Sequence, residues 1–189
     1  MPRTSTDAGG FCVTCAGYGV QCTTAGLPLA YDSLRQHALL VEEIELGEQS
    51  RERGVCCLTV KRAGEKWPFL VLAQSYAPCG TGFEPGALLV PETKMLFFGA
   101  GERILAYRLE PPARIWEDRA ETGFRGWEQH GDAVLLAAEQ EFAAWNTHGR
   151  KLWTTFVEPP WDFTVKGEVV ELEVMGDKRS FDLREGPQT

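Results

Sequence analysis

The sequence lacks any apolar run near the roughly 18 residues that a membrane-spanning helix needs. Its first ten residues, MPRTSTDAGG, lack the apolar segment of a secretory signal, so we expect a cytoplasmic protein without a membrane partner. A basic patch is also missing, because 19 Lys and Arg residues are interspersed among 27 Asp and Glu residues, for a net charge of -8. Most of such a surface repels phosphate backbones, and we therefore expect no nucleic-acid partner.

Motifs for catalysis or phosphate binding are absent too. The stretch FGAGER begins like a dinucleotide fingerprint with Gly99 and Gly101, but Ile104 occupies the place of the third glycine and a strand pattern follows. A hairpin turn explains this stretch better. The three histidines are far apart and form no motif: His37, His130 and His148. We expect a non-catalytic protein, with an enzyme as the alternative, because residues distant in sequence can meet in a fold.

The most specific local pattern is CVTCAGYGVQC, which contains Cys12, Cys15 and Cys22. A Cys-x2-Cys pair in a Gly-rich turn is half of a structural zinc site. Cys22 is a candidate third ligand, and His37 or a core cysteine could be the fourth. No second Cys-x2-Cys pair exists, so the competing interpretation is reduced, unpaired thiols and no cofactor.

Three further cysteines lie outside this pattern. Cys56 and Cys57 are adjacent on a strand-like segment, where they point to opposite faces, and we expect them to pack as small hydrophobic residues. Cys79 lies in the Gly- and Pro-rich stretch SYAPCGTGF, where a nucleophile could be exposed. It has no recognisable partner base, so a catalytic role is only the alternative.

The composition divides the chain at about residue 37. Residues 1–37 are rich in Thr, Gly, Ala and Cys with poor apolar periodicity, which predicts a weakly structured leader with a short helical turn from Asp32, a possible N-cap, to His37. From Ala38 to Thr189, short runs of Val, Leu and aromatic residues alternate with Gly, Pro and charged residues. These are strand lengths separated by turn signals, so residues 38–189 are predicted to form one β-rich domain.

The alanines in the stretch FAAWNTHGRKLWTTF, residues 142–156, favour a helix. Comparison of this stretch with similar segments of the same sequence favours a pair of strands instead. Apolar runs that end in a small residue and an aromatic recur three times, with 38 residues from Tyr107 to Trp145 and 36 from Trp145 to Phe181. Trp116 and Trp153 are 37 residues apart. A period near 37 with several short strands per unit is typical of β-propeller blades, so the repeat predicts strands.

The segment AWNTHGRKLW resembles the outer strand and turn of PQQ-like repeats, the blades of quinoprotein-type β-propellers. The resemblance covers about residues 94–189. It implies that Asn146 bonds to the main chain of its turn, that Gly149 supplies a positive φ, and that Trp153 packs between blades. The first unit departs from the pattern at Arg108, and the third stops before any Trp. None of the ligand residues of quinoprotein dehydrogenases can be placed on this chain.

The fold class predicted is all-β, with tandem short antiparallel sheets in a small or partial propeller-like ring; a two-sheet β-sandwich is the alternative. The predicted function is a non-catalytic scaffold or binding module for a protein or peptide partner, with a homodimer of partial rings left open. Trp127 and Trp161 are candidate binding residues, whereas Trp116 and Trp153 are expected in the core. The alternatives are an enzyme or sensor with a small ligand in the central cavity of a closed or dimeric propeller, and a zinc-stabilised interaction domain.

Overall fold

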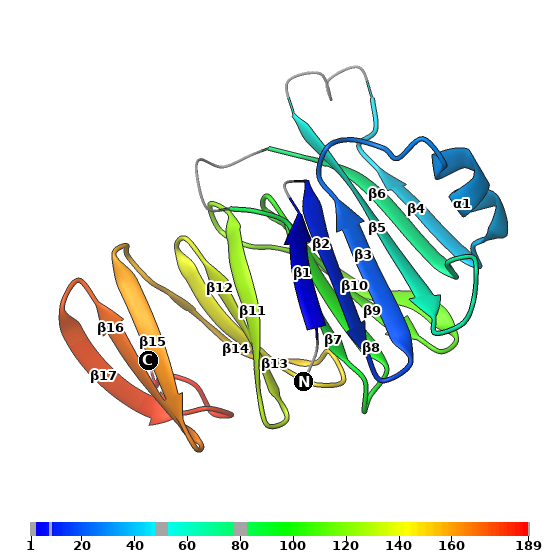
Figure 1. The fold of residues 1–189 in the computed structure, drawn as a ribbon. Coiled ribbons are helices and arrows are strands. Elements are labelled where there is room, and N and C mark those ends of the chain that lie inside the picture. Colours follow the sequence, from blue (N-terminus) through cyan, green and yellow to red (C-terminus); the bar gives the residue numbers. More distant parts are fainter. Residues whose placement is uncertain (1–2, 8, 48–52, 78–82, 189) are drawn as a thin grey trace.

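The computed structural model describes residues 3–7, 9–47, 53–77 and 83–188, which form four β-sheets in a row and one short helix, α1 (Tyr31–His37) (Figure 1). The first sheet has the strand order β1-β2-β3-β5-β6-β4 and contains β1 (Arg3–Asp7), β2 (Gly10–Cys15), β3 (Tyr18–Thr23), β4 (Leu40–Ile44), β5 (Gly54–Arg62) and β6 (Leu70–Tyr76). All its pairs are antiparallel except β4 with β6.

The next three sheets are antiparallel meanders of strands that are consecutive in sequence. The second sheet contains β7 (Gly86–Val90), β8 (Met95–Ala100), β9 (Arg103–Leu109) and β10 (Pro112–Arg119). The third contains β11 (Phe124–His130), β12 (Ala133–Ala138), β13 (Glu141–Asn146) and β14 (Lys151–Phe156). The fourth contains β15 (Trp161–Lys166), β16 (Val169–Val174) and β17 (Asp177–Asp182). Tandem short antiparallel sheets are therefore confirmed, and the two-sheet sandwich is not formed.

The Ala-rich stretch around residues 133–145 forms strands β12 and β13, as the repeat predicts and the helix propensity does not. Both strands are buried on both faces, because a sheet packs on either side of them. Small alanines let neighbouring sheets approach closely, and tertiary packing overrides a weak local preference for helix.

The prediction of a weakly structured leader over residues 1–37 does not hold for the described part of that segment. Strands β2 and β3 form a hairpin, and β3 pairs with β5 in the first sheet. Tyr18, Val20 and Cys22 are buried on one face of β3 while Gln21 is exposed, which is the alternation of a half-buried strand. The short helix is present, but its N-cap is Ala30 and not Asp32.

Three apolar layers hold the row of sheets together, one between each pair of neighbours. Strand β8 shows why: Leu96 and Phe98 pack toward the first sheet, whereas Met95 and Phe97 pack toward the third. A fourth, small cluster lies under α1, where Tyr31 packs on Val71 of the outer face of the first sheet. Among the described residues no helix has the length and apolarity to cross a membrane.

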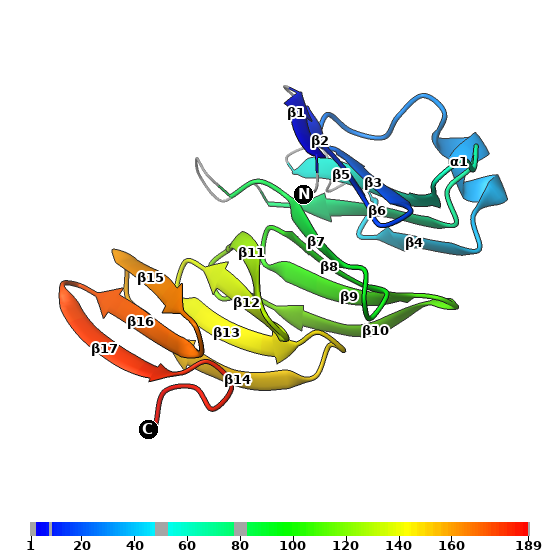
Figure 2. The same cartoon turned by 60° about the horizontal axis from the view of Figure 1, so that its bottom comes forward.

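The row does not close into a ring. Both views place β17 at one end of the molecule and α1 at the other (Figures 1 and 2). The helix covers part of one end, and the other end is the outer face of the fourth sheet. The fold is thus an open, propeller-like stack of four sheets.

A polar cluster around Glu110 joins the first two sheets. The carboxylate accepts a hydrogen bond from Tyr18 at 2.8 Å, forms an ion pair with Lys94, and lies 3.4 Å from Arg62. The bonds from Lys94 and then Tyr18 lower the pKa of Glu110 to about 2. The carboxylate is therefore charged at neutral pH and bridges both sheets.

Candidate functional site

The fourth sheet has three strands where the second and third have four. In the second and third sheets the last strand, β10 or β14, pairs with the strand before it. No described strand pairs with the corresponding edge of β17, whose other edge pairs with β16. An unpaired strand edge presents main-chain donors and acceptors to another chain. This edge is the candidate functional site.

The turn that follows β17 repeats the turn that follows β13. Asn146 Oδ1 accepts hydrogen bonds from the main-chain N–H groups of His148 at 3.1 Å and Arg150 at 2.9 Å, as the PQQ-like resemblance implies. Asp182 Oδ1 accepts from Arg184 at 2.8 Å and from Glu185 at 3.1 Å. Side-chain caps of this kind fix a tight turn. The chain thus leaves β17 as it leaves β13, where β14 then follows.

Each turn also carries a glycine against the tryptophan of the preceding sheet. Gly149 has φ +83° and lies beside Trp116, whose indole N–H donates to the Gly149 carbonyl at 2.6 Å. Gly186 has φ +76° and lies beside Trp153, whose indole N–H donates to the Leu183 carbonyl at 2.8 Å. The positive φ of Gly149 and the packing of Trp153 between sheets are confirmed.

The main chain of β17 shows which residues face the open edge. The N–H of Leu183 donates to Glu168 of the neighbouring strand at 2.8 Å, as that of Thr147 donates to Asp132 in the third sheet at 2.9 Å. Hydrogen-bonded pairs alternate along an antiparallel ladder. The N–H and C=O groups of Lys178 and Ser180 therefore point away from β16, toward the free edge, whereas the C=O of Asp182 accepts from the Gly186 N–H at 2.9 Å in the turn that follows.

The same three side chains lie on the outer face of the fourth sheet, which is polar. Cross-strand pairs form two rows there: Asp162, Glu173 and Lys178, then Thr164, Glu171 and Ser180. The residues that alternate with these along each strand face the third sheet, where Val170 and Leu172 are buried. A terminal sheet with a polar outer face resembles the capping units of stacked repeats, which prevent further stacking.

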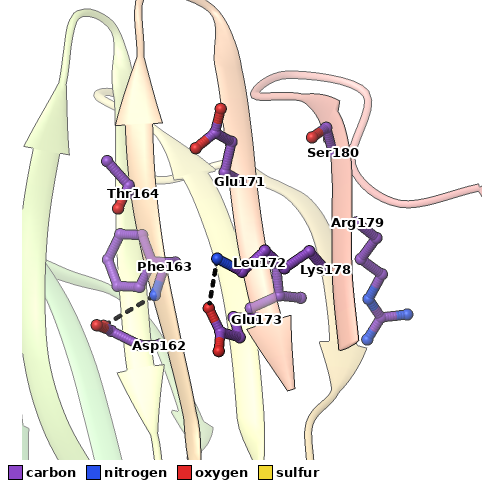
Figure 3. Close-up of a pocket in the computed structure, with 9 residues that line it drawn as sticks. All are labelled: Asp162, Phe163, Thr164, Glu171, Leu172, Glu173, Lys178, Arg179 and Ser180. Atoms are coloured by element: carbon purple, nitrogen blue, oxygen red, sulfur yellow. Dashed lines mark hydrogen bonds and ion pairs between the residues drawn. The ribbon is translucent and has the colours of Figure 1, made fainter. Parts of the chain in front are cut away.

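A shallow hollow of about 290 Å³ lies on this face (Figure 3). Nine residues line it: Asp162, Phe163, Thr164, Glu171, Leu172, Glu173, Lys178, Arg179 and Ser180. The Lys178 ammonium pairs with Glu173 at 3.1 Å, and Figure 3 shows this pair spanning β16 and β17. The Lys178 side chain is 78% exposed, so it can turn toward a new carboxylate at the edge.

The candidate binding residues Trp127 and Trp161 come together at a different hollow, of about 340 Å³, between the third and fourth sheets. Trp161 is 6% exposed, and its indole N–H donates to Glu139. Trp127 is half-buried against Phe97, and its indole nitrogen has no hydrogen-bond partner among the described residues. Both rings belong mainly to the core, and their role in binding stays a prediction.

The structure does not bring the predicted zinc ligands together. In the β2–β3 hairpin, Cys12 is opposite Gln21, Cys15 is opposite Tyr18, and Cys22 is opposite Phe11 at the other end. Within the described ranges no group of three or more potential ligands could hold a metal ion. The zinc hypothesis stays a prediction that this geometry does not support.

Cys56, Cys57 and the FGAGER stretch have structural roles. Cys56 and Cys57 are both buried, as expected for small hydrophobic residues. Burial raises the pKa of the Cys57 thiol to about 12. Gly101 has φ +60° in a tight turn between β8 and β9, which confirms a hairpin. Cys79 lies outside the described residues.

Sequence reasoning missed Lys178, Ser180 and Asp182 as site residues, although a signal was present. Strand β12, in the middle of the row, reads as a continuous apolar run, AVLLAA. Strand β16 reads VVELEV, with exposed and buried residues in alternation. A change from continuous to alternating patterns marks a sheet that is covered on one face only. It identifies the end of the stack and therefore the sheet that carries the open edge.

No protein-family model matches the chain, and no curated protein matches it. Among solved structures it is similar to the β-propeller domain of the trilobed protease from Pyrococcus furiosus, described as having an open velcro topology, at 11% identity and a TM-score of 0.49. That match covers 85% of this chain and 46% of the other. It is also similar to Hsv2 of Kluyveromyces lactis, at 9% identity and a TM-score of 0.31, over 53% of this chain and 32% of that one. The chain thus spans less than half of either structure, and likeness at this level carries no argument about activity.

Proposed function

We propose that this chain is a non-catalytic β-sheet scaffold that engages a protein or peptide partner, and that the partner adds an extended strand along β17. The edge of β17 that no described strand pairs is the single observation that carries the proposal, because an unpaired strand edge presents main-chain donors and acceptors to another strand. Strand addition derives its affinity from main-chain hydrogen bonds and tolerates different side chains. We place the protein in the cytoplasm, where its free thiols would stay reduced.

The PQQ-like identity of the blades belongs to the same proposal. The capped turn at Asn146, the positive φ of Gly149 and the buried Trp153 support it. These features concern sheet packing and imply no quinone chemistry. In Figures 1 and 2 the four described sheets lie in a row and do not form a closed ring, so the edge of β17 is proposed ahead of the enzyme or sensor alternative, which needs a closed or dimeric propeller.

A strand taken from the chain itself is a suitable probe for the edge. A fluorescein-labelled peptide with the sequence of residues 148–157, HGRKLWTTFV, contains β14, which occupies the equivalent edge in the third sheet. We expect saturable binding to the full chain by fluorescence anisotropy. The control peptide carries Pro in place of Thr155, which pairs with Phe142 in the third sheet. Because Pro removes a main-chain donor at the pairing edge, it should bind weakly.

Two protein variants locate the binding. Ser180→Pro removes an N–H that points to the free edge and leaves the bonds between β17 and β16 intact. Loss of one hydrogen bond, about 1 kcal/mol, together with the steric effect of the ring should weaken peptide binding by about tenfold or more. Ser180→Ala keeps the N–H and should bind like the wild type. Absence of binding to the wild type, or equal binding to Ser180→Pro, contradicts the proposal.

A further inference from the structure

We propose that the hollow of about 340 Å³ between the third and fourth sheets binds a small aromatic carboxylate, with its ring between the sheets and its carboxylate on Arg125. The walls come from β11, β12 and β15. This volume is at the lower end of the range for ligand pockets, about 300–1,000 Å³, which suits one or two fused rings. The hollow lies between neighbouring sheets, so it needs no closed ring of blades. It is also separate from the edge of β17.

The third sheet forms a wall of small residues. The register of β11 shifts between Phe124 and Gly126, and Gly126 is opposite Ala137. Ala137 packs in the apolar layer that faces the fourth sheet, and cross-strand partners share a face, so a side chain at position 126 would point into this layer. A Cβ added to Gly126 would have no atom within 4 Å. The hollow therefore includes the space that a larger side chain would occupy.

The fourth sheet forms an aromatic wall opposite. Trp161 and Phe163 both face the third sheet, and their rings stack with 26° between the planes and 6.2 Å between the centroids. The Trp161 indole N–H donates to the Glu139 carbonyl at 2.9 Å, and the Phe163 ring lies 4.6 Å from that of Phe142. These contacts fix both rings in place. A planar aromatic group can stack on such a wall where the opposite wall is only Gly126 and Ala137.

Arg125 adds a positive charge beside the aromatic wall. Its Cζ lies 5.5 Å from the centroid of the Trp161 ring. In the part of the chain that the structure describes, no carboxylate forms an ion pair with Arg125. A guanidinium group presents a planar fork of N–H donors that matches the two oxygens of a carboxylate. A ligand that stacks beside Trp161 can therefore place a carboxylate on Arg125.

The acidic residues of the hollow set the direction of the ligand. Glu128 lies further along β11 and pairs with His130 at 3.1 Å, so it would repel a carboxylate at that end. The Asp162 side chain belongs to the outer face of the fourth sheet, and its Oδ1 accepts the main-chain N–H of Phe163 at 2.9 Å. The charge of the ligand is consequently directed to Arg125 and away from Glu128.

Naphthoate is the probe for this site, and naphthamide, which has the same rings without the charge, is the matched ligand. The isotope-labelled full chain is titrated with each and followed by the main-chain N–H signals in two-dimensional NMR. Naphthoate should shift the signals of Gly126, Ala137 and Phe163 saturably. Naphthamide should bind about tenfold more weakly, because a charge-assisted hydrogen bond to Arg125 is lost.

Three variants locate the site. Arg125→Gln should weaken naphthoate about tenfold and leave naphthamide unchanged, because it removes the charge and keeps most of the side chain. Arg150→Gln is the matched control, since Arg150 is exposed in the turn after β13 and does not line the hollow, and it should bind naphthoate like the wild type. Gly126→Val should abolish binding of both ligands without lowering the melting temperature, because its side chain fills open space and favours a strand.

A wild type without saturable shifts up to millimolar naphthoate overturns the inference. Equal affinity for the two ligands, or equal affinity of wild type and Arg125→Gln for naphthoate, also overturns it, because the site then does not recognise the carboxylate. Shifts confined to residues away from the hollow place the ligand elsewhere and have the same consequence. Binding of the residue 148–157 peptide is measured separately. A chain that binds naphthoate but not this peptide retains the present inference and contradicts only the strand-addition proposal.

Discussion

Replacement of Gly186 by Ala tests how the fourth sheet is attached to the third. An added Cβ would lie 2.7 Å from Trp153 Cβ and Cδ1, and the backbone has φ +76°. The ring cannot retreat, because Phe142 and Phe181 pack at 5.1 and 5.4 Å between ring centroids. Its N–H is also held by the Leu183 carbonyl.

The expected cost has two parts. A left-handed conformation costs a residue other than glycine about 1–2 kcal/mol, and forced overpacking adds about 1–3 kcal/mol. Gly186→Ala should therefore lower the free energy of unfolding by about 2–5 kcal/mol. Gly167→Ala is the matched control: it has φ +64° in the same sheet, with no atom within 4 Å of the added Cβ. It should cost only the backbone part, about 1–2 kcal/mol.

Urea unfolding monitored by tryptophan fluorescence gives both values on one scale. Thermal unfolding gives a second comparison, since 1 kcal/mol corresponds to roughly 2–4 °C in a chain of this size. Equal destabilisation by the two substitutions would refute the reasoning, because the contact with Trp153 would then contribute nothing beyond backbone strain. A larger loss of unfolding free energy in Gly186→Ala than in Gly167→Ala supports the close packing of the Gly186 turn against Trp153.

Two further predictions concern titration and thiol reactivity. Because the bonds from Lys94 and Tyr18 lower the pKa of Glu110 to about 2, its stabilisation is present above pH 4.5, its ordinary value, and is lost as the pH falls toward 2. Glu110→Gln should remove this part of the acid dependence in urea midpoints measured from pH 7 to pH 2.5, and an unchanged profile would contradict the assignment. In iodoacetamide labelling read by mass spectrometry, exposed Cys12 should react in the folded protein and buried Cys57 only after unfolding, whereas equal rates would show that the first sheet opens readily.

The repeat allowed the fold of the second half of the chain to be predicted from the sequence. Regular recurrence of Tyr107, Trp145 and Phe181 was a stronger guide than the alanines of β12 and β13, because these aromatic positions mark where one sheet packs on the next. The first sheet was harder to predict. Its parallel pair of β4 and β6 and the hairpin of β2 and β3 lie outside the repeat and lack its tryptophans.

The candidate site was harder to predict from the sequence than the fold, for a physical reason. A strand edge is free when no other strand pairs with it. Local residue types do not predict which distant strands pair, so they do not predict a free edge either. The chain pattern could indicate that Ser180 stands where Ala106 and Ala144 stand in the other units. It could not indicate that no described strand lies beside it. Trp127 and Trp161, the candidate binding residues, pack in the layers between sheets and line one hollow, and their role in binding stays a prediction.

The polar outer face and the open edge of the fourth sheet have opposite effects on association. Asp162, Glu171 and Glu173 make stacking of another sheet unfavourable, because carboxylates would lose their water. The edge of β17 exposes main-chain groups that water satisfies in the monomer and a strand satisfies equally well in a complex. Natural proteins protect such edges with charged side chains, and Lys178 and Arg179 have this effect against arbitrary strands. A partner that places a carboxylate opposite Lys178 turns the same charge into an attraction, so the residues that prevent aggregation would also select the strand that binds.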